Sequence, residues 1–259
     1  MFTVILLSTI QGISEFLPIS SSAHLLVTPW LLGLQDPGLG FDAAIHIGTA
    51  LALLVFFFGD FLKLWRERSP LLWYIVIASV PAAVLGFLGD KWIESRLHSS
   101  SFAPLIVGVG MVVFSFLLLY VDNTARLERK SESLSLKDTL VIGLAQALAL
   151  IPGTSRSGIT MTAGLWRGLK REDAARFSFL LAAPISLGAG VYKLYDLVKH
   201  PEAGVSGLSL VVGILVSGLV GMAVIKWLIK YLGTHNLRLF VKYRVVFGLI
   251  VIAVWAVRR

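Results

Sequence analysis

Long apolar runs alternate with short charged stretches along almost the whole chain. A transmembrane helix needs about 20 predominantly apolar residues, because each residue advances the helix by only about 1.5 Å. The pattern therefore predicts six membrane-spanning helices, over residues 41–62, 71–88, 102–121, 174–195, 208–229 and 240–257.

Four further apolar segments are too short to cross a bilayer, and they occur as two pairs. Each pair is interrupted by a proline followed by small hydroxylated residues, in the stretches LPISSSAH and IPGTSRSG. A short, interrupted pair is typical of a re-entrant hairpin that enters and leaves on the same side. The predicted segments are 1–17 with 23–33, and 136–151 with 159–166. The predicted fold is an all-α polytopic membrane protein with ten helical segments.

Composition supports a membrane protein and excludes several other classes. The chain has 259 residues, of which 56% are hydrophobic, and it has no cysteine, so disulfides and thiolate metal sites are excluded. The first segment lacks the basic start and cleavage site of a signal peptide, so we expect it to remain in the protein. The net charge of +8 comes from short loops rather than a compact basic domain, which argues against nucleic-acid binding.

The basic residues are distributed unevenly between the two ends of the predicted helices. Sixteen of them fall in or beside four connections, and six fall on the opposite side. By the positive-inside rule, we expect the four rich connections to be cytoplasmic. They contain Lys63, Arg66 and Arg68, then Arg126, Arg129, Lys130 and Lys137, then Arg167, Lys170, Arg171 and Arg176, and finally Lys226, Lys230, Arg238, Lys242 and Arg244; the opposite side has Lys91, Arg96, Lys193, Lys199, Arg258 and Arg259.

With this orientation, one hairpin followed by three spans occurs twice, in opposite directions. The stretch QGISEFLPISSSAH resembles QALALIPGTSRSG, and each is followed by an Asp-Ala-Ala helix start, at Asp42 and at Asp173. We therefore predict a single membrane domain, 1–259, made of inverted repeats over about 1–121 and 136–259 with a cytoplasmic linker at 122–135. Inverted repeats with broken helices place their site near the midplane, where the interruptions meet.

Arg156 is the only basic residue that we expect at membrane depth. A charge there costs about 2.5–3.5 kcal/mol and needs a partner. A phosphate is suitable, because a guanidinium can grip two oxygens while Gly153 and Gly158 let backbone N–H groups approach. The alternative is a structural ion pair with Glu15, and this pair can coexist with phosphate binding.

Glu15 is the only carboxylate inside an apolar segment, and Gln11 shares its helical face four residues earlier. Glu15 is a candidate general base or metal ligand, with Gln11 as a possible second ligand. A solitary buried acid could equally couple protons in a transporter. On chemistry alone these two interpretations are equally supported.

Hydroxyl groups and a histidine gather at the interruptions. Ser20, Ser21 and Ser22 precede His24, and the second interruption has Ser155 and Ser157. An acid, a histidine and a serine together suggest a nucleophile, but serines in broken helices often only satisfy freed backbone groups. His46, on the following helix, is predicted to be an ordinary interior histidine.

These motifs resemble those of a known family. Gln11-x-x-x-Glu15 followed by PISSSAH, then PGTSRSG, and the run DAARFSFLLAAP at 173–184 are similar to the signatures of the undecaprenyl-diphosphate phosphatases, membrane proteins associated with bacitracin resistance. The resemblance covers nearly the whole chain. It implies an enzyme that hydrolyses the terminal phosphate of a C55 isoprenyl diphosphate and so regenerates the cell-wall lipid carrier. The rival interpretation is a lipid flippase or secondary transporter, which uses the same architecture.

The resemblance also implies roles for individual residues. Glu15 takes the invariant acidic position and Gln11 the variable one, so the motif supplies one carboxylate here rather than two. Ser21 corresponds to the proposed nucleophile or hydroxyl ligand, His24 to the motif histidine and Arg156 to the phosphate-binding arginine. The remaining expected phosphate ligands are Gly153, Ser22, Ser155 and Ser157, although many members have Thr-Gly in place of Ser22-Ala23.

The family further implies a divalent cation, Mg²⁺ or Ca²⁺, and a location in the bacterial cytoplasmic membrane with the site open to the outer face. The expected partners are the isoprenyl diphosphate and the bilayer, and the sequence permits a homo-oligomer.

Overall fold

The computed structural model describes residues 1–34, 38–93, 97, 100–199 and 206–258. Within these residues the chain is helical, and the only extended pairing is an isolated bridge between Arg129 and Leu169. The prediction of an all-α polytopic membrane protein is confirmed. Of the predicted loop charges, Arg96 and Arg259 lie outside the described residues.

The long helices match the predicted spans. Five are long and apolar enough to cross a membrane, and the predicted span 41–62 is a pair of helices bent by 56° at a break. That break is at Phe57, where neither Pro nor Gly interrupts the chain. The helices are α3 (Leu39–Phe56) with α4 (Phe58–Arg66), α5 (Pro70–Ile93), α6 (Ala103–Thr124), α9 (Arg171–Lys199), α10 (Gly207–Leu232) and α11 (Arg238–Arg258).

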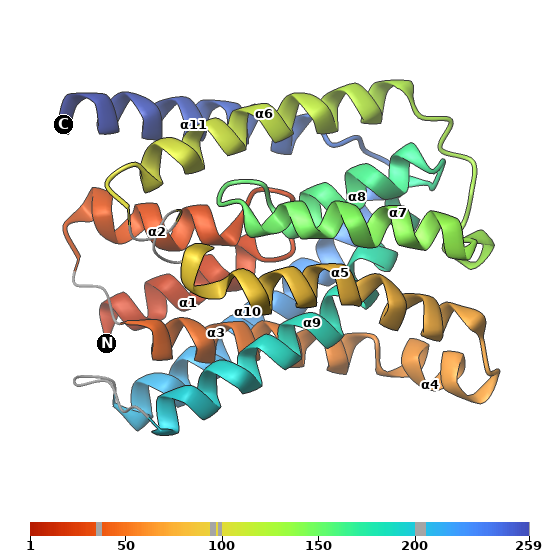
Figure 1. The fold of residues 1–259 in the computed structure, drawn as a ribbon, viewed down its shortest axis with the longest axis horizontal. Helices are drawn as coiled ribbons and strands as arrows, with labels where there is room; N and C mark the ends of the chain where they lie inside the picture. Colours follow the sequence, from red (N-terminus) through yellow and green to blue (C-terminus); the bar gives the residue numbers. More distant parts are fainter. Residues whose placement is uncertain (35–37, 94–96, 98–99, 200–205, 259) are drawn as a thin grey trace.

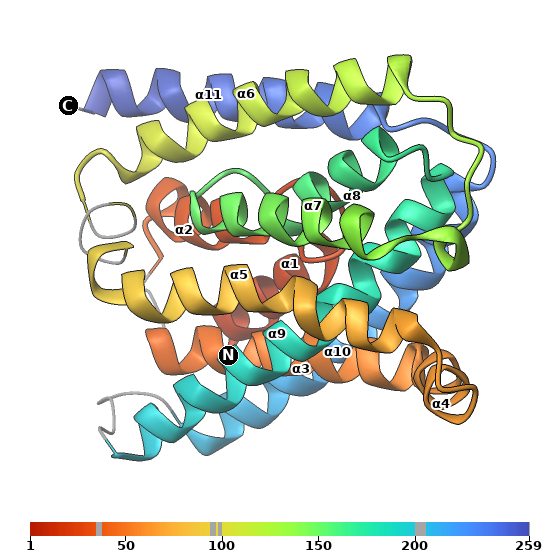
Figure 2. The same ribbon diagram turned by 45° about the vertical axis from the view of Figure 1, so that its right-hand side comes forward.

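The four short segments form two helical hairpins that pack among the long helices. They are α1 (Phe2–Ser14) with α2 (Ser21–Leu32), and α7 (Leu136–Ala147) with α8 (Arg156–Trp166), where a 3₁₀ turn at Leu148–Leu150 extends α7. Figures 1 and 2 show these hairpins between the α6 and α11 pair on one side and α3, α9 and α10 on the other. The turns of the two hairpins therefore meet inside the protein.

Packing follows the duplicated order of the elements. Helix α1 packs on α10 as α7 packs on α5, while α3 pairs with α9 and α6 with α11. Both hairpin contacts use glycine: a Cβ on Gly12 would lie 2.8 Å from the Ser217 carbonyl oxygen, and a Cβ on Gly143 would lie 2.4 Å from that of Ala78. Small residues allow such close approach in membranes. The repeat boundaries near residues 121 and 136 stay a prediction.

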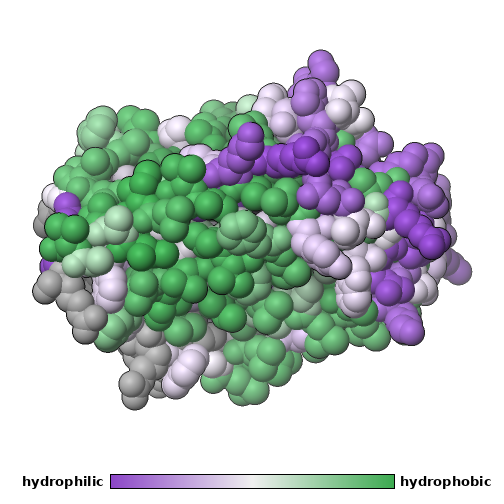
Figure 3. Space-filling view, turned by 90° about the horizontal axis from the view of Figure 1, so that it is seen from above, coloured by the Kyte–Doolittle hydropathy of each residue, from purple (hydrophilic) through white to green (hydrophobic). Residues whose placement is uncertain are grey.

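Polar surface gathers at one end of the molecule, and apolar side chains cover most of the rest of the face shown in Figure 3. Figure 1 places α4 and the connections α6 to α7, α8 to α9 and α10 to α11 at this same end. The four charge-rich connections therefore share one side, as predicted. Exposed apolar side chains on the long helices, such as Leu88 and Leu219, are suited to contact lipid.

Ion pairs hold the charged end together. Asp138 accepts from Arg129 at 2.9 Å and pairs with Arg167 at 2.6 Å, and Arg171 pairs with Asp122 at 2.6 Å. Burial alone would raise the pKa of the Asp138 carboxyl, but hydrogen bonds from Arg129, Ser135 and Arg167 outweigh burial and hold that pKa below its usual value. The linker between the repeats is thus fastened to the start of α7 and to the α8 to α9 connection.

Candidate active site at the two hairpin turns

The two turns use the same unusual backbone. Ser20 precedes α2 with φ 75° and ψ 97°, and Ser155 precedes α8 with φ 71° and ψ 112°. Positive φ is unfavourable for a residue with a side chain, and such strain is concentrated at functional sites. In each turn the serine hydroxyl lies 3.2 Å from the hydroxyl two residues later, that of Ser22 or Ser157. Each half-helix therefore begins with the same conformation, and its first residue is Ser21 or Arg156.

Arg244 connects the two turns, which corrects the sequence analysis. It was assigned to a cytoplasmic connection, but it lies fully buried in α11. Its guanidinium donates to the carbonyl oxygens of Gly153 and Thr154 at 2.9 Å and of Pro18 at 3.2 Å. The expectation that Arg156 is the only basic residue at membrane depth is therefore wrong. The predicted span 240–257 already contained Arg244, so the sequence did indicate a second basic residue inside a span.

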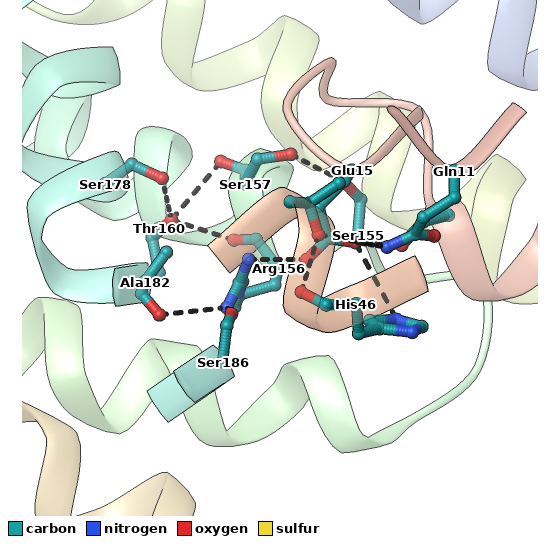
Figure 4. A network of polar contacts seen from close by, with 12 residues as sticks. Gln11, Glu15, His46, Ser155, Arg156, Ser157, Thr160, Ser178, Ala182 and Ser186 are labelled. Carbon is teal, nitrogen blue, oxygen red and sulfur yellow. Dashed lines mark hydrogen bonds and ion pairs between the residues drawn. The ribbon is translucent and has the colours of Figure 1, made fainter. Parts of the chain in front are cut away.

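Glu15 is the centre of a polar cluster that combines both repeats (Figure 4). Arg156 Nη2 donates to Glu15 Oε1 at 2.6 Å, although the residues are 141 positions apart. Ser21 Oγ donates to Glu15 Oε2 at 2.5 Å, and Gln11 Nε2 donates to the same oxygen at 3.2 Å. The predicted convergence of Glu15 and Arg156 is confirmed. The Glu15 carboxylate, a candidate base, is thus in direct contact with both a hydroxyl and a guanidinium.

Helix α9 holds the arginine from the other side. Arg156 Nη1 donates to the Ser186 hydroxyl and to the Ala182 carbonyl oxygen, the latter at 3.3 Å. Thr160, one turn after Arg156, shares a hydrogen bond of 2.6 Å with Ser178, also on α9 (Figure 4). The two contacts of Nη1 fix the guanidinium plane, as bidentate binding of a phosphate requires, and the Thr160 contact holds α8 against α9.

A cavity of about 290 Å³ opens beside this cluster. It is lined by the first half of α3 and the second half of α9. These halves of the two helices are distant from the charged end. The cavity therefore lies between the turns and the less charged end. Its lining includes Glu15, Ser21, Ser22, His46, Gln146 and Arg156.

His46 faces this cavity, so the prediction of an ordinary interior histidine is wrong. Its side chain is 37% exposed, and its Nε2 lies 4.0 Å from Glu15 Oε2. Its Nδ1 lies 2.7 Å from the Asp42 carbonyl oxygen one turn earlier, an acceptor that requires a proton on Nδ1. His46 is thereby oriented toward the carboxylate.

Comparison with known proteins identifies the family. The profile of the family described as Bacitracin resistance protein BacA matches residues 4–250. The chain belongs to this family. Similar BacA relatives, each named undecaprenyl-diphosphatase, occur in Moorella thermoacetica (41% identical, covering 98% of both chains), Pelotomaculum thermopropionicum (43%, covering 100% of this chain and 98% of the relative) and Alteromonas mediterranea (42%, covering 97% of both).

The motif histidine of this BacA protein, His24, does not line the cavity. Its ring stacks on Phe247 at 4.7 Å between centroids and on Tyr243 at 5.6 Å. Both ring nitrogens have partners, Nδ1 with the Ser20 carbonyl oxygen at 2.7 Å and Nε2 with the Tyr243 hydroxyl at 2.6 Å. These contacts suit a residue that positions the first turn against α11.

The expected phosphate ligands of the second turn fall into two groups. Ser155 lines the cavity, and its hydroxyl also accepts from the Gly158 amide at 3.1 Å as a helix cap. Gly153 and Ser157 do not line it. Gly153 has φ 88°, and a Cβ there would lie 2.3 Å from the Val107 carbonyl oxygen, while Ser157 donates to the Leu17 carbonyl oxygen at 2.9 Å. These two residues hold the turns in place.

The side chains present fit a divalent cation that is shared with a phosphate. Among the described residues, no three His, Cys, Asp or Glu side chains form a metal-binding group. However, the buried Gln11 Oε1 has no hydrogen-bond partner there, and it lies on the residue that contacts Glu15. Mg²⁺ is usually bound by one or two carboxylates, waters and substrate phosphate oxygens. Glu15 and Gln11 fit this kind of site.

Proposed function

We propose that this BacA protein hydrolyses undecaprenyl diphosphate to undecaprenyl phosphate and inorganic phosphate. This reaction recycles the lipid carrier of cell-wall synthesis and confers resistance to bacitracin. The observation that carries the proposal is the contact of Glu15 with both Ser21 and Arg156 at the edge of one cavity. The names of the relatives, which match the chain over almost its full length, support the same activity.

The cavity has a polar side for the diphosphate and an apolar side for the tail. The polar part of its lining comes from the two turns, His46 and Ser186, and the apolar part includes Ala82, Ala149 and Leu150. Neighbouring side chains on α5 and the 3₁₀ turn, Leu85 and Leu148, are 52% and 42% exposed. We therefore place the terminal phosphate at Arg156 and the isoprenyl chain along α5 toward the lipid.

The cluster provides a nucleophile, a base and a charge clamp. When the terminal phosphate binds, its oxygens compete with Glu15 for the Arg156 fork, which leaves the carboxylate free to accept the Ser21 proton. Ser21 Oγ then attacks the terminal phosphorus, and the bond to the bridging oxygen breaks, so the lipid monophosphate leaves. Water subsequently cleaves the phosphoserine. Arg156 neutralises charge throughout, which is the main requirement of phosphoryl transfer.

A divalent cation held by Glu15, Gln11 and the diphosphate would supply further neutralisation of phosphate charge. In its presence, water activated by Glu15 is the alternative nucleophile to Ser21.

The proposed location is the bacterial cytoplasmic membrane, with the site open to the outer face. The charge-rich end is cytoplasmic by the positive-inside rule, and the cavity lies on the opposite side of the turns.

The deciding experiment is inorganic phosphate release from undecaprenyl diphosphate by purified protein in detergent, with Mg²⁺, with Ca²⁺ and with EDTA. We expect release that depends on the cation. A flippase or transporter of the same architecture would release no phosphate under any of these conditions, and that result would overturn the proposal.

A further inference from the structure

Gln146 is a buried amide that makes no hydrogen bond within the described part of the chain. Its residue is 2% exposed, and neither Nε2 nor Oε1 has a partner. An unmade hydrogen bond of a buried polar group costs about 1–3 kcal/mol, so buried groups almost always have partners. The free protein is therefore destabilised at this position unless something enters the cavity to bind the amide.

Gln146 belongs to the lining of the active-site cavity. Gln146 lines the same cavity as Glu15, Ser21 and Arg156, but it comes from α7. Helix α7 packs tightly on α5 at Gly143, and one turn further along, Gln146 lies with Ala82 of α5 and with Ala149 and Leu150 in the cavity wall. It is thus a polar residue whose neighbours in the cavity lining include apolar side chains.

Comparison with the first repeat shows that Gln146 lacks an intramolecular role. Gln11 is in the corresponding place before the first turn, and its Nε2 donates to Glu15 at 3.2 Å and to Thr49 at 3.4 Å. The second repeat has Leu150, not an acid, four residues after its glutamine. Gln146 therefore keeps both N–H donors free.

We infer that Gln146 binds the phosphate that remains attached to the isoprenyl chain. This inference rests on the proposed function. A phosphate monoester or diphosphate has only oxygen acceptors at neutral pH, and the carboxamide supplies two donors. With the terminal phosphate at Arg156 and the tail on the apolar side, the lipid-linked phosphate lies between them, where Gln146 lines the wall. Gln146 is thus a substrate-binding residue and places the scissile bond at Ser21.

The test measures affinity and stability in the same variants. The probes are farnesyl monophosphate and a farnesyl diphosphate whose bridging oxygen is replaced by CH₂, so that no turnover occurs. Because hydrogen bonds to charged groups are strong, we expect Gln146→Leu to raise both Kd values by about 10- to 100-fold. The Tm of the free variant stays equal or rises, because an unsatisfied amide is removed. Gln146→Glu keeps the shape, adds negative charge and weakens binding further.

Gln11→Leu is the matched contrast, since it loses two hydrogen bonds and should lower Tm in the free protein. Unchanged Kd values in Gln146→Leu and Gln146→Glu overturn the inference, and so does a lower Tm with unchanged affinity. A loss confined to the diphosphate analogue overturns the assignment to the lipid-linked phosphate. Failure of the proposed function is seen separately, as an absence of phosphate release by the wild type.

Discussion

At the start of α2, Ser20 has φ 75°, and at the start of α8, Ser155 has φ 71°, but the residue that follows is Ser21 in one turn and Arg156 in the other. The two turns share a strained backbone and a pair of hydroxyls 3.2 Å apart. They differ in the side chains directed to the site, because the first supplies a carboxylate and a hydroxyl and the second a guanidinium. The duplicated backbone therefore provides the frame, while reaction chemistry depends on side chains that the two turns do not share.

The comparison also explains why neither repeat can contain the site alone. Glu15 needs Arg156 as a partner in the interior, and both turns need Arg244, which comes only from the second repeat. A buried charge without a partner is strongly unfavourable. The site therefore exists only where the two hairpins meet.

The largest effect is expected from removing the charge that each turn contributes. Arg156→Ala and Glu15→Ala should each lower phosphate release by several orders of magnitude, because charge neutralisation and the base are lost. The measurement is kcat/KM with purified protein, and the folded state is checked by gel filtration. Arg238→Ala, at the exposed Arg238 that donates to Asn123, is the control and should remain active. Near-normal turnover in either site variant would contradict the mechanism.

Ser21→Ala tests the first turn separately. If Ser21 is the nucleophile, kcat should fall about 100-fold or more, since single nucleophile deletions reach far larger losses elsewhere. Ser22→Ala should have a smaller effect, because the Ser22 hydroxyl contacts Ser20 and not Glu15. Substantial residual activity in Ser21→Ala would assign the attack to water, and trapping of a phosphoserine in the wild type would exclude that alternative.

Arg244→Leu tests the connection between the turns. It leaves three buried carbonyl groups without their donor, and each such loss costs about 1–3 kcal/mol. We expect a large decrease in Tm and, at temperatures where the variant is folded, reduced phosphate release. Arg244→Lys should be intermediate, because an ammonium keeps the charge but cannot span the carbonyls as a planar fork. An unchanged Tm in Arg244→Leu would show that the turns hold together without it.

Hydropathy predicted the helices well because membrane spans must satisfy their own backbone hydrogen bonds, which makes length and polarity decisive. Glu15 and Arg156 could be paired from sequence because isolated interior charges need partners. The bend at Phe57 could not be predicted, because no proline or glycine occupies the break.

Side-chain directions were the main source of error. The role of His24 in the reaction stays a prediction, but the sequence could not show that Tyr243 and Phe247 of α11 determine where its ring lies. His46 faces the cavity because of how α3 packs against α9 and α10. Both outcomes depend on helices distant in sequence, and local spacing contains no information about them. Arg244 was assigned by its neighbours Lys242 and Arg238, although it lies well inside α11, which starts at Arg238.

The smallest effect should distinguish the two serines with positive φ. Glycine adopts this conformation without strain, but it also increases the conformational entropy of the unfolded chain, so the two effects nearly cancel. The Ser155 hydroxyl accepts from the Gly158 amide at 3.1 Å, whereas Ser20 makes no side-chain cap. The free energy of unfolding should therefore be lower in Ser155→Gly than in Ser20→Gly, by about 0.5–1 kcal/mol. Chemical denaturation in detergent measures this difference. Equal free energies of unfolding for the two variants would mean that the cap at α8 contributes no stability. Both serines would then contribute to folding only through the backbone conformation that they share.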